Sequence, residues 1–185
     1  MKLHFFTFLV SIFFFSCSQV EQTTSNVSEK ISSIDYDAKL KELGIELTTP
    51  TKPVANYVNV VQTGKLLFLA GKGPKMADGN YVKGFLGKDV SVEEGYKAAR
   101  RVGELQLAVL KDHLGDLNKV KRIVKVLGLV RGTDDFGNQP EVMNGFSDLM
   151  VEVFGDKGKH ARAALGTNSL PRNICLEIEM IVEVY

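Results

Sequence analysis

The stretch Leu176-Glu177-Ile178-Glu179-Met180-Ile181-Val182-Glu183-Val184, close to the end of the chain, decides the fold class. Its even positions are all apolar, and three of the positions between them are glutamates. This period of two predicts a β-strand with one apolar face and one carboxylate-bearing face. An apolar strand face needs a covering layer, so we expect helices from elsewhere in the chain to pack on it.

Two upstream segments have the pattern of long amphipathic helices. The first begins at Ser91-Val92-Glu93-Glu94, a capping box in which the serine hydroxyl and the glutamate carboxylate bond each other's backbone amides. It ends at Gly115, and its inner face carries Tyr96, Ala99, Val102, Gln106, Val109 and Leu110. The second begins at Pro140, whose missing amide proton costs nothing there, and ends at Gly155. Its inner face carries Val142, Phe146, Leu149, Met150 and Val153.

Further strands are predicted on either side of the first helix. Tyr57–Val61 and Leu66–Ala70 flank the turn Gln62-Thr63-Gly64-Lys65, which is typical of a β-hairpin. The run Lys121–Val130 is rich in Ile, Val and Leu, as buried strands are. Together these elements predict an α+β fold, with a single mixed sheet and two long helices packed on one face.

The beginning of the chain is typical of an exported protein. Residues 1–16 contain Lys2 and then the uncharged run Phe5–Phe15, the layout of a signal peptide and too short to span a bilayer. Cys17 follows a small residue, as the lipidated cysteine of a bacterial lipoprotein does. Ordinary signal cleavage nearby, with Cys17 incidental, is the alternative. Because Ser18 is not acidic, we expect a lipid-anchored protein on the periplasmic side of the outer membrane.

The rest of the chain divides into a tether, a connector and one domain. Residues 17–32 are polar after the cysteine and are expected to form a flexible tether. Residues 33–53 should form a short helix, ended by Gly44, and a connector rich in Thr and Pro. Residues 54–185 are long enough for one domain with its own hydrophobic core. An apolar stripe on the short helix is expected from Ile34, Leu40 and Leu43.

Composition excludes several classes of function. The chain has 23 basic and 22 acidic residues, a balance that offers no electrostatic footprint for nucleic acid. If Cys17 is acylated, Cys175 has no disulfide partner and is expected to be a small buried side chain. The two cysteines lack metal-ligand spacing, and only His113 and His160 remain after signal removal, so we expect no metal site.

Several motifs occur in an order that points to a known family. The C-terminal part contains His160-Ala161-Arg162-Ala163-Ala164-Leu165-Gly166, then Ser169-Leu170-Pro171, then Leu176-Glu177-Ile178-Glu179. The N-terminal part contains Asn56-Tyr57-Val58 and Thr63–Gly71, and Gly115–Val120 joins helix to strand. In order and spacing the chain resembles the Rid family, the reactive-intermediate deaminases also called YjgF or L-PSP proteins. The second helix and the loop Gly155–Lys159 resemble a longer, atypical branch, here carried as a lipoprotein.

The resemblance implies a fold, an assembly and an activity. Family members are chorismate-mutase-like subunits of homotrimers, with sites in the clefts between subunits. They hydrolyse 2-imino acids or enamines to 2-keto acids and ammonia, without a cofactor. By resemblance, Arg162 would hold the substrate carboxylate through two parallel donors, and Glu177 would orient the attacking water and handle its proton. Tyr57 and Gly71 would line the cleft.

Each of these residues also has a purely structural interpretation. Arg162 could form an ion pair with Glu177 or Glu179. Glu177 shares its strand face with Glu179 and Glu183, so the alternation alone does not select it, and it could be simply solvated. Tyr57 could be an ordinary core aromatic.

Departures from the family pattern keep a second function open. Ala164 stands where many members have a cysteine, and Gly166 stands where a glutamate is common. Ala70-Gly71-Lys72-Gly73-Pro74 replaces a more usual Ser-Gly-Gln run. The hypotheses are therefore an imine deaminase and a trimer of the same fold that binds a small carboxylate without turnover. A third, a lipid-tethered structural trimer without a ligand, is the least favoured because Arg162 is retained.

Overall fold

The computed structural model describes residues 34–185. The expected signal peptide at residues 1–16, the lipidation site Cys17 and the tether lie outside the described residues. Within the described part, the elements follow the order α1, β1, β2, α2, β3, α3, β4, β5, with three short 3₁₀ turns between them.

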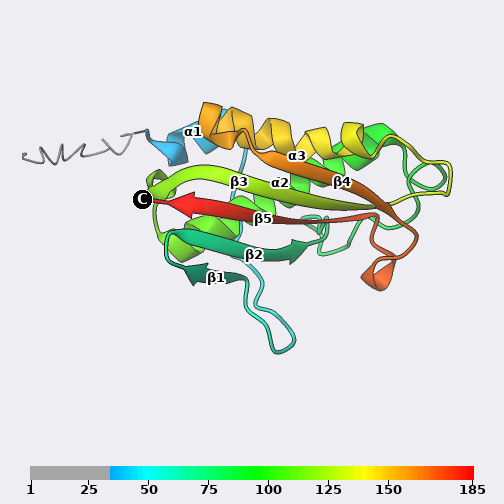
Figure 1. The fold of residues 1–185 in the computed structure, drawn as a ribbon, viewed down its shortest axis with the longest axis horizontal. Coiled ribbons are helices and arrows are strands. Elements are labelled where there is room, and N and C mark those ends of the chain that lie inside the picture. Colours follow the sequence, from blue (N-terminus) through cyan, green and yellow to red (C-terminus); the bar gives the residue numbers. More distant parts are fainter. Residues whose placement is uncertain (1–33) are drawn as a thin grey trace, which may run out of the picture. The chain divides into compact units, whose positions relative to one another are not determined.

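A five-stranded mixed sheet forms one layer of the fold (Figure 1). Its strands are β1 (Val60–Thr63), β2 (Leu66–Lys72), β3 (Val120–Arg131), β4 (Ala161–Thr167) and β5 (Leu176–Val184), in the spatial order β1-β2-β5-β3-β4. The pairs β1/β2, β2/β5 and β5/β3 are antiparallel, and β3/β4 is parallel. The parallel pair needs a crossover connection, which α3 supplies. The prediction of an α+β fold with one mixed sheet is confirmed.

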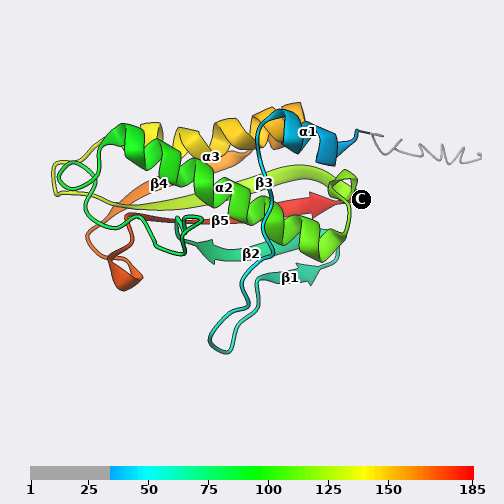
Figure 2. The same cartoon turned by 180° about the vertical axis from the view of Figure 1, so that it is seen from behind.

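Two long helices, α2 (Val92–Leu114) and α3 (Gln139–Phe154), cover one face of the sheet (Figure 2). The Ser91–Glu94 capping box is formed in full, and Gly115 ends α2 with a positive φ of 74°. The helices cross closely at Gly145, where a Cβ would collide with the Tyr96 carbonyl. Glycine is therefore required at that position for the helix layer to form.

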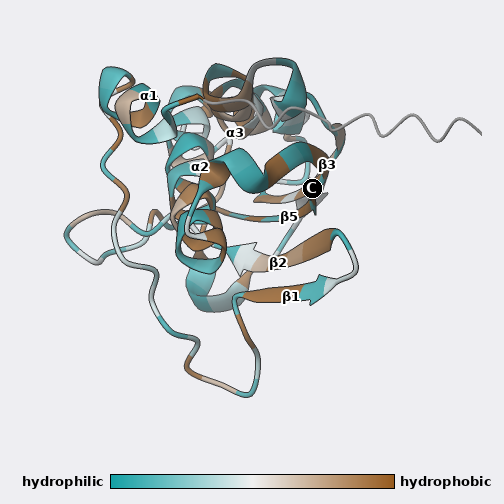
Figure 3. Ribbon diagram, turned by 90° about the vertical axis from the view of Figure 1, so that its left-hand side faces the viewer, coloured by the Kyte–Doolittle hydropathy of each residue, from teal (hydrophilic) through white to brown (hydrophobic). Residues whose placement is uncertain are grey.

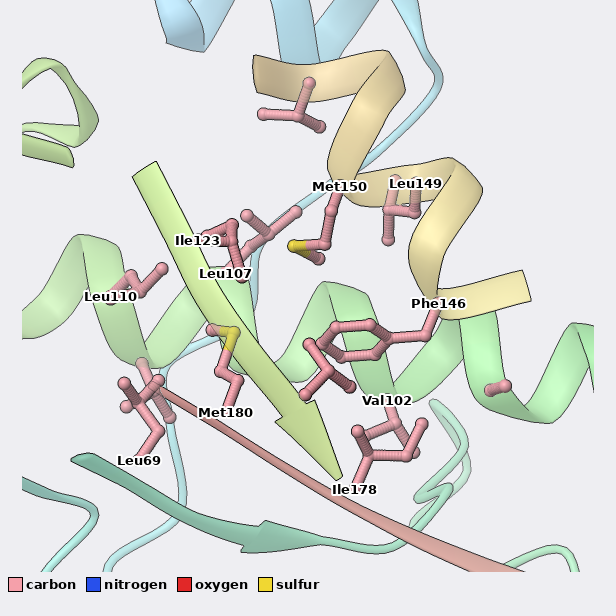
Figure 4. Close-up of a cluster of buried hydrophobic side chains, with 14 of the residues drawn as sticks. Leu69, Val102, Leu107, Leu110, Ile123, Phe146, Leu149, Met150, Ile178 and Met180 are labelled. Atoms are coloured by element: carbon pink, nitrogen blue, oxygen red, sulfur yellow. The ribbon is translucent and has the colours of Figure 1, made fainter. Parts of the chain in front are cut away.

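The hydrophobic core fills the space between the helices and the sheet (Figure 4). The alternation of the last strand is confirmed, because its even residues are buried and Glu179 is exposed. The residues labelled in Figure 4 come from every layer: Val102, Leu107, Leu110, Phe146, Leu149, Met150, Leu69, Ile123, Ile178 and Met180. The other sheet face keeps exposed apolar side chains, among them Val61 and Phe68 on the strands seen in Figure 3.

The segment before the sheet corrects two details of the sequence analysis. The short helix α1 (Tyr36–Glu42) is capped by Asp35, and it buries Tyr36 and Leu40, whereas Ile34 precedes it and is exposed. The first strand begins at Val60 rather than at Tyr57, so Tyr57 lies in the connector and is 54% exposed. The apolar residues of this segment did not show where the connector ends and the strand begins. That boundary is set by pairing with β2, which starts at Val60.

Candidate functional site

Arg162 lies on β4, an edge strand that the sequence analysis did not assign. In the parallel ladder it stands beside Val126, and its guanidinium reaches back to α3. The Nη1 group donates to Asn144 Oδ1 and to Ser147 Oγ, both at 3.0 Å. The Nη2 group donates to the Pro140 carbonyl at 3.4 Å. The ion pair with Glu177 or Glu179, weighed from the sequence, is not formed.

The bonds to α3 leave part of the guanidinium free. An arginine has five N–H donors, and three are used by the bonds to α3. The Nε–H and one Nη2–H have no partner among residues 34–185. These two groups are neighbours on the planar guanidinium, which is the geometry that a carboxylate binds in bidentate fashion. Arg162 is thus fixed in place by its own chain and still able to hold a carboxylate.

A chain of hydrogen bonds behind Arg162 fixes Ser147. The Gly158 carbonyl lies 2.6 Å from His160 Nδ1, so this nitrogen carries the proton and donates. His160 Nε2 is then the acceptor for the Ser147 hydroxyl, at 3.1 Å. Burial lowers the pKa of His160, the hydrogen bond to Gly158 opposes this in part, and the nearby charge of Arg162 lowers the pKa further, so the neutral form is favoured. The Ser147 oxygen therefore keeps its lone pairs for the Arg162 guanidinium.

Sequence reasoning missed the α3 side of this network. Asn144 and Ser147 are three residues apart on α3, a spacing that places both on one helix face. His160 stands two residues before Arg162, a spacing that places both on one side of the extended chain. These spacings were signals that could have found the residues, once the helix and the strand were known to be neighbours.

Glu177 lies on β5 and points away from the helices, toward Gly71 of β2. A Cβ on Gly71 would overlap the Glu177 carboxylate, so the glycine provides the room for this side chain. Burial raises the pKa of Glu177, and the neighbouring charge of Glu179 raises it further. Among the described residues Glu177 has neither a hydrogen bond nor an ion pair. A carboxylate with a raised pKa and free oxygens is suited to accept a proton from water.

Gln106 fixes the backbone beside Glu177 and Gly71 from the helix side. It is fully buried on α2, and its Nε2 donates to the carbonyls of Ala70 and Ile178, each at 3.0 Å. These carbonyls belong to the residues next to Gly71 and Glu177, where the β2/β5 register shifts. Gln106 therefore connects the two strands at the irregularity that brings Gly71 and Glu177 together. The helix pattern had placed Gln106 on the inner face but gave it no role.

Tyr57 lies near Gly71 in a cavity of about 660 Å³ between the connector and α2. Its exposure excludes the interpretation of Tyr57 as a core aromatic. Lys72, which replaces a family glutamine, lines the same cavity, and its Nζ donates to Asn59 Oδ1 at 2.5 Å. Burial lowers the pKa of Lys72. The structure thus brings Tyr57, Gly71 and Lys72 together at one edge of the sheet.

Within one chain, the side chains of Arg162 and Glu177 are not in contact. β3 separates their strands, and Arg162 stands beside Val126 whereas Glu177 stands beside Leu129. Strand spacing and rise put the two Cα atoms about 14 Å apart. The odd offset along β3 also sends the two side chains to opposite faces of the sheet. A reaction that uses both residues needs two copies of the chain.

The remaining candidates concern metals, membranes and Cys175. Cys175 is buried as expected, and burial raises the pKa of its thiol to about 12. Ala164 packs against the core where many family members have cysteine. Residues 34–185 contain no cluster of His, Cys, Asp and Glu that could hold a metal ion. In the same part of the chain, no helix has the length and apolarity to cross a membrane.

The fold and the site define the class of protein: a chorismate-mutase-like α+β fold with the candidate arginine on an edge strand and the candidate glutamate on the central strand of one sheet. Residues 37–184 match the family model "YjgF/chorismate_mutase-like, putative endoribonuclease". The chain belongs to this YjgF, or Rid, family.

Relatives support the assignment. Protein TCP17 of Trypanosoma cruzi is 39% identical over 148 residues, which cover 80% of this chain and 92% of TCP17. A RutC family protein of Pyrococcus horikoshii, PH0854, is 32% identical over 131 residues, covering 70% of this chain and 88% of that protein. The crystal structure of Atu1372 from Agrobacterium tumefaciens is 40% identical, with a TM-score of 0.75, and the match covers 81% of this chain and 94% of Atu1372.

Proposed function

We propose that the protein hydrolyses 2-imino acids or their enamine tautomers to 2-keto acids and ammonia, in sites shared between two copies of the chain. The observation that carries the proposal is the guanidinium of Arg162, which α3 fixes while two neighbouring donors stay free. Glu177, with its raised pKa, supplies the second group that the reaction needs. Neither residue has the other as a structural partner, so a salt bridge does not account for them.

The chemistry follows from the two groups. Arg162 binds the substrate carboxylate and so places the adjacent C=N carbon. The Glu177 carboxylate takes a proton from a water molecule as the water oxygen bonds to that carbon, and Glu177 then gives this proton to the imine nitrogen, which forms a neutral carbinolamine. Glu177 next takes the proton of the carbinolamine hydroxyl and passes it to the nitrogen, while the C–N bond breaks, the C=O bond forms and ammonia leaves. The nitrogen gains both protons that the water oxygen loses and Glu177 ends as it began, so atoms and protons balance and no cofactor takes part.

Assembly into a trimer is part of the proposal. The sheet face away from the helices exposes Val61, Phe68 and Leu165, an apolar surface that association would bury. A cyclic assembly brings different edges of two copies together, as a heterologous interface requires. Arg162 of one copy would then lie near Glu177, Gly71 and Tyr57 of another.

Binding of a small carboxylate without turnover is the second candidate function. It is favoured by Ala164 and Lys72, which remove a polar cysteine and introduce a cation beside the proposed site. The two candidates share Arg162 and differ in Glu177, which only the hydrolytic reaction needs.

The decisive experiment mixes the purified protein with a 2-imino acid generated in situ and follows keto-acid release. We expect acceleration over buffer in the parent protein and its loss in Arg162→Ala and in Glu177→Gln. The control variant Arg122→Ala removes an exposed arginine from the same sheet and should be as active as the parent. No acceleration with several imino acids, together with Arg162-dependent binding of 2-keto acids, would favour the second candidate.

Co-expression tests whether the site is shared. Arg162→Ala and Glu177→Gln should each be inactive alone. In mixed trimers about a quarter of the interfaces would combine an intact Arg162 with an intact Glu177 from a neighbour. We expect activity near that fraction of the parent's, whereas no recovery would show that both groups act within one chain.

We also propose that Cys17 anchors the protein to a membrane by a lipid after export. Metabolic labelling with palmitate should mark the parent protein, and Cys17→Ser should lose the label. Labelling that persists in Cys17→Ser would overturn the anchor.

A further inference from the structure

The cavity between the connector and α2 has a lining of one charge sign. It is lined by five basic side chains, Lys52, Lys72, Lys75, Arg101 and Arg172, and by no acidic residue. Hydroxyl groups of the connector threonines and of two tyrosines complete its polar lining, and Leu105 and Val109 of α2 contribute an apolar wall. Its volume of about 660 Å³ is in the range of small-molecule sites. Figure 2 shows the connector crossing α2 on its way from α1 to the loop below β1.

Most of these positive charges are not neutralised by other side chains of residues 34–185. Arg101 is paired with Glu104 at 2.6 Å, and its Nε is used by the Lys75 carbonyl. Lys52, Lys72, Lys75 and Arg172 have no ion pair among the described residues. Glu177, the nearest functional carboxylate in the sheet, does not line the cavity.

Among these basic side chains, Lys72 would be stabilised most by a negatively charged ligand. It is partly buried, and its hydrogen-bond partner is the neutral side chain of Asn59. Burial lowers its pKa, and no carboxylate acts in the opposite direction. A cation removed from water without a counter-charge is destabilised, and an anion bound beside it would relieve that cost.

Arg172 reaches the cavity from a strained turn. Its φ is 56° and that of Asn173 is 60°, so two successive residues other than glycine adopt the left-handed region. Arginine has no local reason to adopt this conformation, which costs about 1 kcal/mol or more. Such strain is found where a side chain is needed in a given place, and this one lines the cavity.

We propose that the cavity binds a small organic anion, with its carboxylate or phosphate group held by Lys72 and Arg172 and its apolar body packed on Leu105 and Val109. The anion-binding groups Lys72 and Arg172 differ from the Arg162 carboxylate clamp, and Arg162 of the same chain lies on the far edge strand of the sheet. The inference rests on the proposed function in one respect, because that function would bring Arg162 of a neighbouring copy near the Gly71 and Tyr57 end of the cavity. The cavity adjoins the proposed catalytic groups only through Gly71 and Tyr57.

Calorimetric titration of the full-length protein tests the proposal with three probes of similar shape. These are 3-phenylpropanoate, phenyl phosphate and the neutral 3-phenylpropanamide. We expect the anions to bind and the amide to bind at least tenfold more weakly, and we expect added salt to weaken anion binding. The tighter of the two anions identifies carboxylate or phosphate as the group recognised.

Variants locate the binding. Lys72→Met and Arg172→Gly should each weaken anion binding about tenfold or more, whereas Lys72→Arg should retain most of it. Glycine at position 172 also relieves the strain of the turn, so the Arg172→Gly variant should fold. It therefore tests the site even if Lys72→Met proves unstable. Lys65→Met, the same substitution at the exposed hairpin turn, should bind as the parent does.

The outcomes that overturn the proposal are separate from those that overturn the hydrolytic function. Absence of anion binding, equal binding of the amide, or unchanged affinity in both Lys72→Met and Arg172→Gly would overturn it. So would anion binding that Arg162→Ala abolishes and Lys72→Met leaves intact. Keto-acid release from imino acids is measured in a different assay, and its failure would leave the cavity site standing.

Discussion

The β4 edge of the sheet and its centre, where β5 lies beside β2, position their candidate functional groups by different means. At the β4 edge, Arg162 is surrounded by polar partners on α3, and the network continues through Ser147 to His160. At the β2/β5 side, Glu177 has no polar partner in the part of the chain that the structure describes, and space left by Gly71 admits its carboxylate. A binding group benefits from a fixed orientation, whereas a proton acceptor benefits from unsatisfied lone pairs. The contrast teaches that the β4 edge suits a binding group and the β2/β5 side a proton acceptor.

The largest expected effect comes from Glu177→Gln. If Glu177 is the general base, keto-acid release should fall by about 10²–10⁴-fold. Glu183→Gln, on the same strand, is the matched control and should stay close to the parent. Equal loss in both variants would contradict the difference between the β4 edge and the β2/β5 side.

The same variant should become more stable at neutral pH. The folded-state pKa of Glu177 is raised, so its contribution to stability is greatest below the unfolded pKa and is lost as pH rises through the folded pKa. At neutral pH the charged group opposes folding, and glutamine removes that opposition. Thermal unfolding at pH 7 should therefore show a higher Tm for Glu177→Gln than for the parent, and a lower Tm would contradict the assignment.

Arg162→Lys tests the orientation supplied by the β4 edge. Lysine keeps the charge but cannot both donate to α3 and present two parallel donors to a carboxylate. We expect kcat/KM to fall by about 10–150-fold, the equivalent of one or two hydrogen bonds to a charged group. Arg122→Lys, at an exposed position of β3, should change little. Full activity of Arg162→Lys would show that charge alone is enough.

Gln106→Met tests how the β2/β5 side is built. Methionine fills a similar volume but leaves the carbonyls of Ala70 and Ile178 without their buried donor. We expect the free energy of unfolding to fall by about 1–3 kcal/mol in urea titration. The control Gln62→Met replaces an exposed glutamine that bonds only the nearby Gly64 carbonyl, and it should cost much less. Equal costs would mean that the register shift does not depend on Gln106.

Sequence periodicity predicted the helices and strands that have one apolar and one polar face. It missed the elements whose position depends on pairing with another strand. The alternation of residues 176–184 and the helical faces of α2 and α3 gave the core and the fold class. The β4 edge has small residues and little alternation, so it was recognised only as a motif around Arg162. Tyr57 was placed too early in a strand, because pairing with β2 and not local propensity sets where β1 begins.

For the candidate site, the sequence supplied residues and not their surroundings. The family motif pointed to Arg162 and Glu177, but not to the partners that orient them. Asn144 and Ser147 are 18 and 15 residues from Arg162 in sequence, so their hydrogen bonds depend on how α3 packs beside β4. The cavity beside Lys72 likewise forms only when the connector passes along α2.

Ser147→Ala is expected to have a smaller effect, confined to substrate binding. It removes one acceptor from Arg162 and the link to His160, but it leaves Asn144 in place. We expect KM to rise about fivefold, from the loss of roughly 1 kcal/mol, with kcat unchanged. Ser169→Ala is the matched control, because the Ser169 hydroxyl makes no hydrogen bond in the described structure. A fall in kcat instead of a rise in KM would place Ser147 in the chemical step.

The smallest effect concerns the pH dependence of the β2/β5 side. Activity should fall as pH decreases through the pKa of Glu177, because the protonated carboxyl group cannot accept a proton. The acidic limb of the pH profile should therefore lie above about 4.3, the pKa of an unperturbed glutamate. Burial is the larger cause of the raised pKa and the charge of Glu179 the smaller, so Glu179→Gln should move the acidic limb of kcat/KM only part of the way down. Glu183→Gln, whose charge does not contribute to the pKa of Glu177, should leave the limb where it is. A limb that moves upward in Glu179→Gln, or equally in both variants, would mean that the titrating group is not Glu177.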